Sequence, residues 1–183
     1  MGKAIAVVLC QRILHDYGMS FSAASVANEF LRLANRDRKR ITPLKMQKLV
    51  YFAHGWYLAV TGEPLLTEPI QAWKYGPVIP TLYREFKECG SSPIEFPATR
   101  QIPGTGSVIA KLEQEGDAAD IDLARKVIER VWDQYGHYSA AQLTSLTHNE
   151  GSPWDLVPNK DELGVEISNM SIRDYFVRTA QTT

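Results

Sequence analysis

The stretch from Thr42 to Val78 reads TPLKMQKLVYFAHGWYLAVTGEPLLTEPIQAWKYGPV and joins a long aromatic helix to a tight Tyr-Gly-Pro turn. Thr42 can cap the helix, Pro43 can occupy its first position, where a missing amide proton does no harm, and Gly62 is the natural terminator. No catalytic motif lies inside the stretch. An aromatic helix followed by a fixed turn can build a core and present a surface, so the pattern favours recognition.

The predicted helix carries apolar side chains on two sides. One continuous apolar arc is wider than the stripe of an ordinary surface helix, and a second seam at seven-residue spacing lies on the opposite side. We therefore expect this helix at the centre of the fold, with neighbours on two sides. The arc comprises Met46, Leu49, Val50, Phe52, Ala53, Trp56, Tyr57 and Val60, the seam comprises Leu44, Tyr51 and Leu58, and the distinctly polar positions are Lys45, Gln47, Lys48 and His54.

Regular structure is also expected on both sides of this helix. Ser22 precedes apolar residues at three-and-four spacing and predicts a helix to about Asn35. Residues 69–75 read as a short strand or extended segment, closed by Gly76-Pro77. Pro80 can then open a helix over residues 81–89.

The rest of the chain is predicted to be helical after one long connection. Residues 91–119 are rich in proline and glycine and are expected to contain a short strand or hairpin, with the β segment near residues 107–112. Helix starts are expected at Asp120 or Asp122, at Ser139 with Gln142 as a capping box, and at Ser171 with Asp174. The predicted fold class is mainly α, with a minor β component near the Trp-Lys-Tyr-Gly-Pro turn and in the 91–119 connection. We expect an N-terminal extension over residues 1–18 and a single compact helical domain over residues 19–183.

Charge is distributed unevenly along the 183 residues, although the formal net charge is only −1. Residues 1–50 carry nine Lys and Arg against three Asp and Glu, whereas residues 51–183 carry eleven against eighteen. The basic cluster at Arg36 to Arg40, joined by Lys45 and Lys48, allows three interpretations. It can be a solvated turn, which we favour over a phosphate-binding surface, or it can be a basic edge that steers an acidic protein partner.

Cysteine usage and hydropathy indicate a soluble cytoplasmic protein. Cys10 and Cys89 lie far apart and fit no metal-ligand spacing, as suits a reducing compartment. The apolar run from Ala4 to Cys10 is far shorter than the roughly 20 residues that a membrane span needs. No association with a membrane is expected.

Catalytic chemistry is not evident in the sequence. No two of the four histidines have the spacing that places two ligands on one metal, so neither a metal nor a cofactor is expected. His54 can act as a base, but a histidine at the polar edge of a central helix is more often a hydrogen-bonded structural group. The Gly104 to Ser107 segment resembles part of a phosphate loop but lacks the lysine that should follow. We therefore expect that the protein is not an enzyme. The alternative is a hydrolase or transferase with a cryptic active site.

The aromatic turn is the best candidate for a partner-binding site. Tyr and Trp are enriched among the residues that dominate interface energies. An alternative of equal weight is that these rings only pack the turn onto the central helix. The candidate residues are Trp73, Lys74, Tyr75, Gly76 and Pro77, with His54, His148 and Trp154 as possible neighbours.

Four segments together resemble the SocA-like antitoxin family, also called the Panacea domain, which includes phage-associated proteins of the GepA type. They are LKMQKLVYFAHGWYLAVTGEPL, EPIQAWKYGPVIPTLYREF, LTHNEGSPW and IRDYF. The resemblance covers roughly residues 21–178, so residues 1–18 lie outside it.

The resemblance implies a small, mostly helical prokaryotic or phage protein that neutralises a cognate protein toxin by binding it directly. The antitoxin after which the family is named is similar to a proteolytic adaptor, a protein that hands its toxin to a ClpXP-type protease. The resemblance supplies no catalytic residues. A nucleic-acid-binding regulator that uses the basic N-terminal part stays an alternative, although nucleic acid is not the expected partner.

Overall fold

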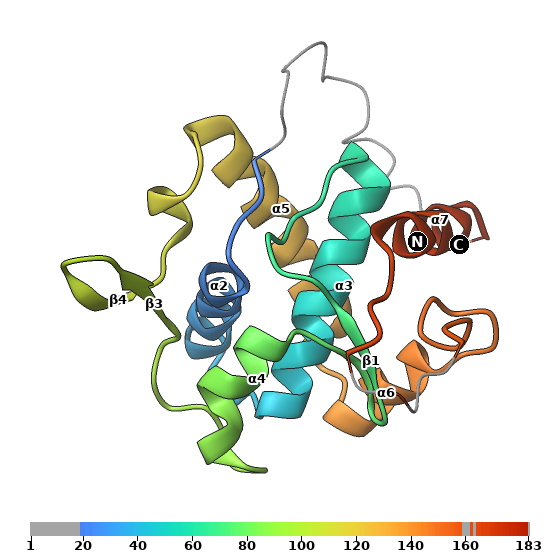
Figure 1. The fold of residues 1–183 in the computed structure, drawn as a ribbon, viewed down its shortest axis with the longest axis horizontal. Coiled ribbons are helices and arrows are strands. Elements are labelled where there is room, and N and C mark those ends of the chain that lie inside the picture. The colour runs from blue at the N-terminus through green and yellow to red at the C-terminus, as the bar shows by residue number, and fades with distance from the viewer. Residues whose placement is uncertain (1–18, 159–161, 163, 183) are drawn as a thin grey trace.

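Six α-helices and two short β-hairpins make up the part of the chain that the structure, a computed structural model, describes: residues 19–158, 162 and 164–182 (Figure 1). This confirms the mainly α fold with a minor β component. The elements are α2 (Ala23–Arg36), α3 (Pro43–Thr61), β1 (Gln71–Trp73), β2 (Gly76–Val78), α4 (Pro80–Phe86), β3 (Thr99–Ile102), β4 (Gly106–Ile109), α5 (Ala118–Tyr135), α6 (Ala140–Thr147) and α7 (Asn169–Thr182), with short 3-10 helices η2 (Lys87–Cys89) and η3 (Leu112–Gln114). The expected extension over residues 1–18, with Cys10 and His15, lies outside the described residues.

Helix α3 runs through the middle of the fold, as the two apolar sides of its sequence predict. Figure 1 shows α2 and α4 on one side of it and α6 and α7 on the other, and it also contacts α5 and β2. Thr42 Oγ1 accepts the amide of Lys45, Pro43 occupies the first turn, and Gly62 ends the helix with φ of +80°. Every side chain from Met46 to Leu58 is buried, polar ones included.

Aromatic side chains join α3 to α5 and α7. Phe52 stacks on Tyr135 with ring centroids 4.5 Å apart. Trp56 donates its indole N–H to the Tyr135 hydroxyl over 3.3 Å and packs edge-on against Phe176. Gly55 allows this approach, because a Cβ placed there would lie 2.2 Å from the Phe176 ring. The core of the described residues is therefore built around α3.

Two helix starts differ from the sequence predictions. Helix α5 is capped by Asp117, whose carboxylate accepts the amides of Ala119 and Asp120 over 2.9 Å, so the expected starts at Asp120 and Asp122 are wrong. Asp120 instead lies buried in the first turn. Helix α7 begins before Ser171, whose amide is accepted by Ser168 Oγ. The cap at Ser22 and the capping box of Ser139 with Gln142 are confirmed.

The two hairpins flank the helical core and have different supports. β1 pairs antiparallel with β2, with Trp73 opposite Gly76, and contacts α3 and α6 through β2. β3 pairs antiparallel with β4 and lies beside α2 (Figure 1). No helix in the part of the chain described here is long and apolar enough to cross a membrane.

Candidate partner-binding site

Both edges of the β1–β2 hairpin are hydrogen-bonded. On the outer edge of β1, the amide of Ala72 donates to the carbonyl of Val165 over 2.8 Å. On the side facing α3, the Gln47 side chain accepts the amide of Ile79 over 2.8 Å and donates to its carbonyl over 3.2 Å. Because these groups are already paired, a partner would have to bind the side chains of the turn rather than extend the sheet.

Lys48 fixes the turn from below. Its ammonium donates to the carbonyls of Tyr75 over 2.6 Å and Pro77 over 3.1 Å, and the side chain is 0% exposed. Among the described residues no carboxylate forms an ion pair with it. Burial without a counter-ion lowers the pKa of Lys48 to about 7. The expectation that Lys48 extends the surface cluster of basic residues is therefore wrong, because its ammonium is buried and donates to backbone carbonyls.

Gly76 lets the turn approach α3 and α6 closely. Its φ is +98°, a backbone conformation that side-chain-bearing residues rarely adopt. A Cβ at this position would lie 2.5 Å from Lys48 Nζ, 2.9 Å from Thr147 Oγ1 and 3.1 Å from His148 Nε2. Glycine is thus required both by the backbone and by the space.

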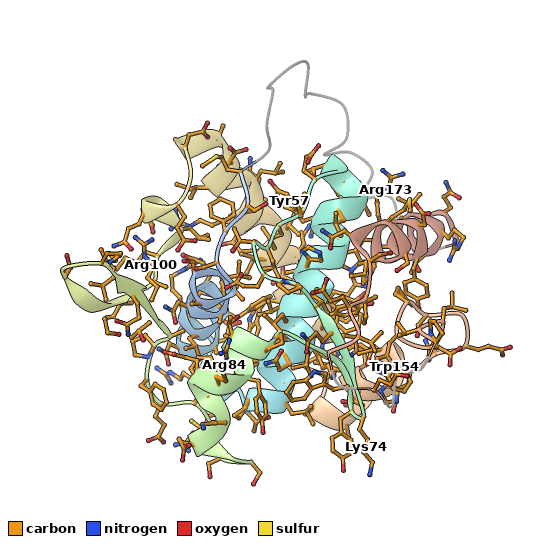
Figure 2. The ribbon with its side chains drawn as sticks, in the orientation of Figure 1. Tyr57, Lys74, Arg84, Arg100, Trp154 and Arg173 are labelled. Carbon is orange, nitrogen blue, oxygen red and sulfur yellow. The ribbon has the colours of Figure 1, made fainter. Side chains whose placement is uncertain are left out.

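The structure brings His148 and Trp154 to this hairpin from the C-terminal part of the chain. The indole N–H of Trp154 donates to the carbonyl of Trp73 over 2.8 Å, and the Trp154 ring stacks on His148 with centroids 3.7 Å apart. Figure 2 shows Trp154 beside the hairpin and Lys74 at its tip. Trp73 also packs edge-on against Tyr83 of α4. Segments separated by more than 60 residues thus meet at one place.

We call the exposed side of this assembly the hairpin face, comprising Trp73, Lys74, Tyr75, Tyr83 and Trp154. Tyr75 is 64% exposed, and the Lys74 ammonium lies 5.7 Å from the centre of its ring. Trp73 and Trp154 are partly buried, whereas the predicted site residues Gly76 and Pro77 are buried and shape the turn from within. Aromatic rings on a fixed backbone can supply interface area at a low entropic cost.

His54, the remaining predicted site residue, does not lie on the hairpin face. Its side chain is 1% exposed, and its Nδ1 accepts the amide of Leu66 over 3.3 Å. Nε2 must therefore carry the proton, which it donates to Asn169 Oδ1 over 2.9 Å. Burial lowers the pKa of His54 to about 4, so the ring is neutral at pH 7. The side chain joins α3 to the start of α7 and has the structural role that the sequence favoured.

Sequence reasoning missed three residues that build the site: Gln47, Lys48 and Tyr83. The first two were recognised as polar positions on an otherwise apolar helix, but their backbone partners lie about 30 residues away in the sequence and could not be inferred from it. Tyr83 gave no signal beyond its position in a predicted helix.

The family model described as "Antitoxin SocA-like, Panacea domain" matches residues 46–155, a span that includes the buried part of α3, the β1–β2 hairpin and α6. The chain belongs to this family. Within the Panacea family, Antitoxin SocA of Caulobacter vibrioides (strain NA1000 / CB15N) is 36% identical over 163 residues, which cover 86% of this chain and 83% of that protein. No solved structure matches the chain.

Proposed function

We propose that this protein is a cytoplasmic antitoxin that binds a cognate protein toxin through the hairpin face and neutralises it without covalent chemistry. The relative named Antitoxin SocA supports the antitoxin role. The observation that carries the choice of surface is the exposure of Tyr75 on a hairpin whose backbone is held by Lys48 of α3 on one side and by Val165 on the other. A partner that binds there meets a preformed shape, so little conformational entropy is lost on binding.

The chemistry of the site favours binding over catalysis. His54 is buried and neutral and is hydrogen-bonded on both nitrogens, so it does not converge with a tyrosine and a carboxylate in a cleft. The buried Lys48 ammonium contacts two backbone carbonyls and is covered by the turn. These side chains hold a shape, which is the role a recognition module requires.

The structure leaves few unpaired side chains in the basic cluster for the alternative function, nucleic-acid binding. Arg36 pairs with Asp37 over 2.7 Å, and Lys45 donates to the carbonyl of Gly136 over 2.9 Å. With Lys48 buried, Arg38 to Arg40 remain as the exposed basic residues of this turn that form no ion pair with a described residue. Because non-specific nucleic-acid affinity grows with the number of phosphates neutralised, so short a cluster favours the protein partner.

The test is co-expression with the products of the adjacent genes, with rescue of growth from a toxic product and the affinity of the purified complex as readouts. We expect Tyr75→Ala to weaken the complex by about thirtyfold or more, corresponding to about 2 kcal/mol for an aromatic anchor. Met170→Ala, which removes a comparably exposed apolar side chain on α7, is the matched control and should rescue growth fully. A folded Tyr75→Ala variant with unchanged affinity would overturn the choice of surface.

We further propose, from the family resemblance, that the complex can be delivered to a ClpXP-type protease. Rescue experiments in cells with and without that protease separate the two steps. Rescue that depends on the protease, with an unchanged complex in vitro, supports delivery. Rescue that is equal in both cells shows that binding alone neutralises the toxin.

A further inference from the structure

A surface groove separate from the hairpin face runs along α2. It has a volume of about 570 Å³ and lies between α2, residues 94–97 and the segment from the end of β4 into η3. Leu31, Phe96 and Ile109 supply apolar surface to it, and the last two are 45% and 48% exposed. Large apolar side chains left this open beside one another are typical of binding surfaces.

The walls of the groove are held in place by Asn28 of α2. Its Oδ1 accepts the amide of Ala98 over 2.7 Å, and its Nδ2 donates to the carbonyls of Ala98 over 2.9 Å and Ala110 over 2.8 Å. The side-chain amide thus takes the place of a peptide group at the base of the β3–β4 hairpin. Because the hairpin is fixed to α2 in this way, the groove exists before any ligand arrives.

The charges inside the groove neutralise one another. Glu29 pairs with Arg32 over 2.8 Å and with Arg125 over 3.2 Å, and Arg125 also pairs with Glu113. An occupant of this part therefore meets no net charge, and apolar contact with Phe96 and Ile109 decides what binds.

One end of the groove is basic. It continues into a hollow of about 250 Å³ lined by Lys39, Arg40 and Glu95 at the turn between α2 and α3. Within residues 19–158 and 164–182, neither Lys39 nor Arg40 has an ion pair with a carboxylate, and Arg38 is exposed next to them. An acidic group at this end would be attracted, while a basic one would be repelled.

We propose that this groove binds an extended segment of a partner protein that is apolar in its middle and acidic at the end that reaches Arg40. A protein segment fits better than nucleic acid, because Phe96 and Ile109 present apolar surface. None of the residues that line the groove belongs to the hairpin face, so the two sites can be tested independently.

The experiment uses the full chain and two fluorescent peptides that share a Val-Leu-Phe-Val core. One carries a Glu-Asp-Glu flank and the other a Lys-Arg-Lys flank, and binding is measured by fluorescence anisotropy at low and high salt. We expect the acidic peptide to bind at least about tenfold more tightly, with Arg40→Glu abolishing this preference. Ile109→Asp should weaken the acidic peptide by about tenfold. Tyr75→Ala, on the hairpin face, should leave it unchanged.

Each alternative outcome counts against the proposal. Equal affinity for the two peptides, no binding of either, or insensitivity to both groove substitutions would overturn it. So would a random-sequence oligonucleotide that binds the chain and competes for Arg40. Arg40 and Ile109 are exposed, so circular dichroism and thermal midpoints are expected to match the wild type. Toxin binding that persists when these peptides fail would leave the antitoxin proposal intact.

Discussion

Lys48 makes the stability of this protein depend on pH in a way that one substitution can reveal. The ordinary pKa of a lysine, 10.5, falls to about 7 at this position because the ammonium is buried. The folded state therefore holds the proton less tightly than the unfolded chain does, and the protonated form costs stability. Below pH 7 the full cost is present, and it declines as the pH rises from 7 towards 10.5.

The magnitude follows from the pKa difference. At about 1.36 kcal/mol for each unit of pKa, a fall from 10.5 to about 7 corresponds to a cost of about 5 kcal/mol at low pH. Linkage then predicts that the free energy of unfolding rises by about 2.5 kcal/mol between about pH 6 and pH 9 through this group alone.

The assay is urea unfolding of the wild type and of Lys48→Met across that pH range. The Met side chain fills similar space but cannot titrate, so the rise of about 2.5 kcal/mol should be missing from this variant. Lys126→Met removes an exposed lysine that pairs with Asp122, and it should keep the wild-type slope.

The slope is the informative quantity, because Lys48→Met also leaves the carbonyls of Tyr75 and Pro77 without their donor, and that loss lowers stability by an amount that does not change with pH. Parallel curves for the wild type and Lys48→Met would refute the reasoning. They would mean that the buried amine has the same pKa in the folded and unfolded states.

Three further substitutions test the packing. Gly76→Ala should destabilise the fold by about 2 kcal/mol or more and weaken toxin binding, because the new methyl group collides with Lys48 Nζ and the φ of this residue is strained for alanine. Thermal unfolding and the affinity of the complex measure the two effects. Asn28→Ala should cost about 2 to 3 kcal/mol, since the buried Ala98 amide and Ala110 carbonyl lose their partner, and amide exchange at Ala98 should accelerate. Trp56→Ala should cost about 3 to 5 kcal/mol in urea unfolding, whereas a cost under about 1 kcal/mol would contradict its place in the core.

Local rules accounted for much of the helical framework. The Thr42 cap, Pro43 and the left-handed Gly62 act within one turn of α3, so their effect can be read from neighbouring residues. The capping box at Ser139 is equally local. The start of α5 was missed because Asp117, Asp120 and Asp122 are all able to cap, and nothing in the local sequence chooses among them.

The candidate site could be anticipated only in outline. An aromatic turn beside a helix was visible in the sequence, as was the possibility that Trp154 joins it. The hydrogen bond from Trp154 to Trp73 spans 81 residues, and no spacing rule covers such a distance. Its existence depends on how α6 and the following loop pack against β2.

The sequence by itself therefore determined which segments are helices and that α3 is apolar on two sides, because capping and side-chain spacing act over a few residues. Only the tertiary structure decided that Gln47, Lys48 and His54 point inward rather than to solvent. A polar side chain can be buried only where another segment supplies its hydrogen-bond partner. Those partners, the backbone of residues 75–79, Leu66 and Asn169, come into place when the chain folds.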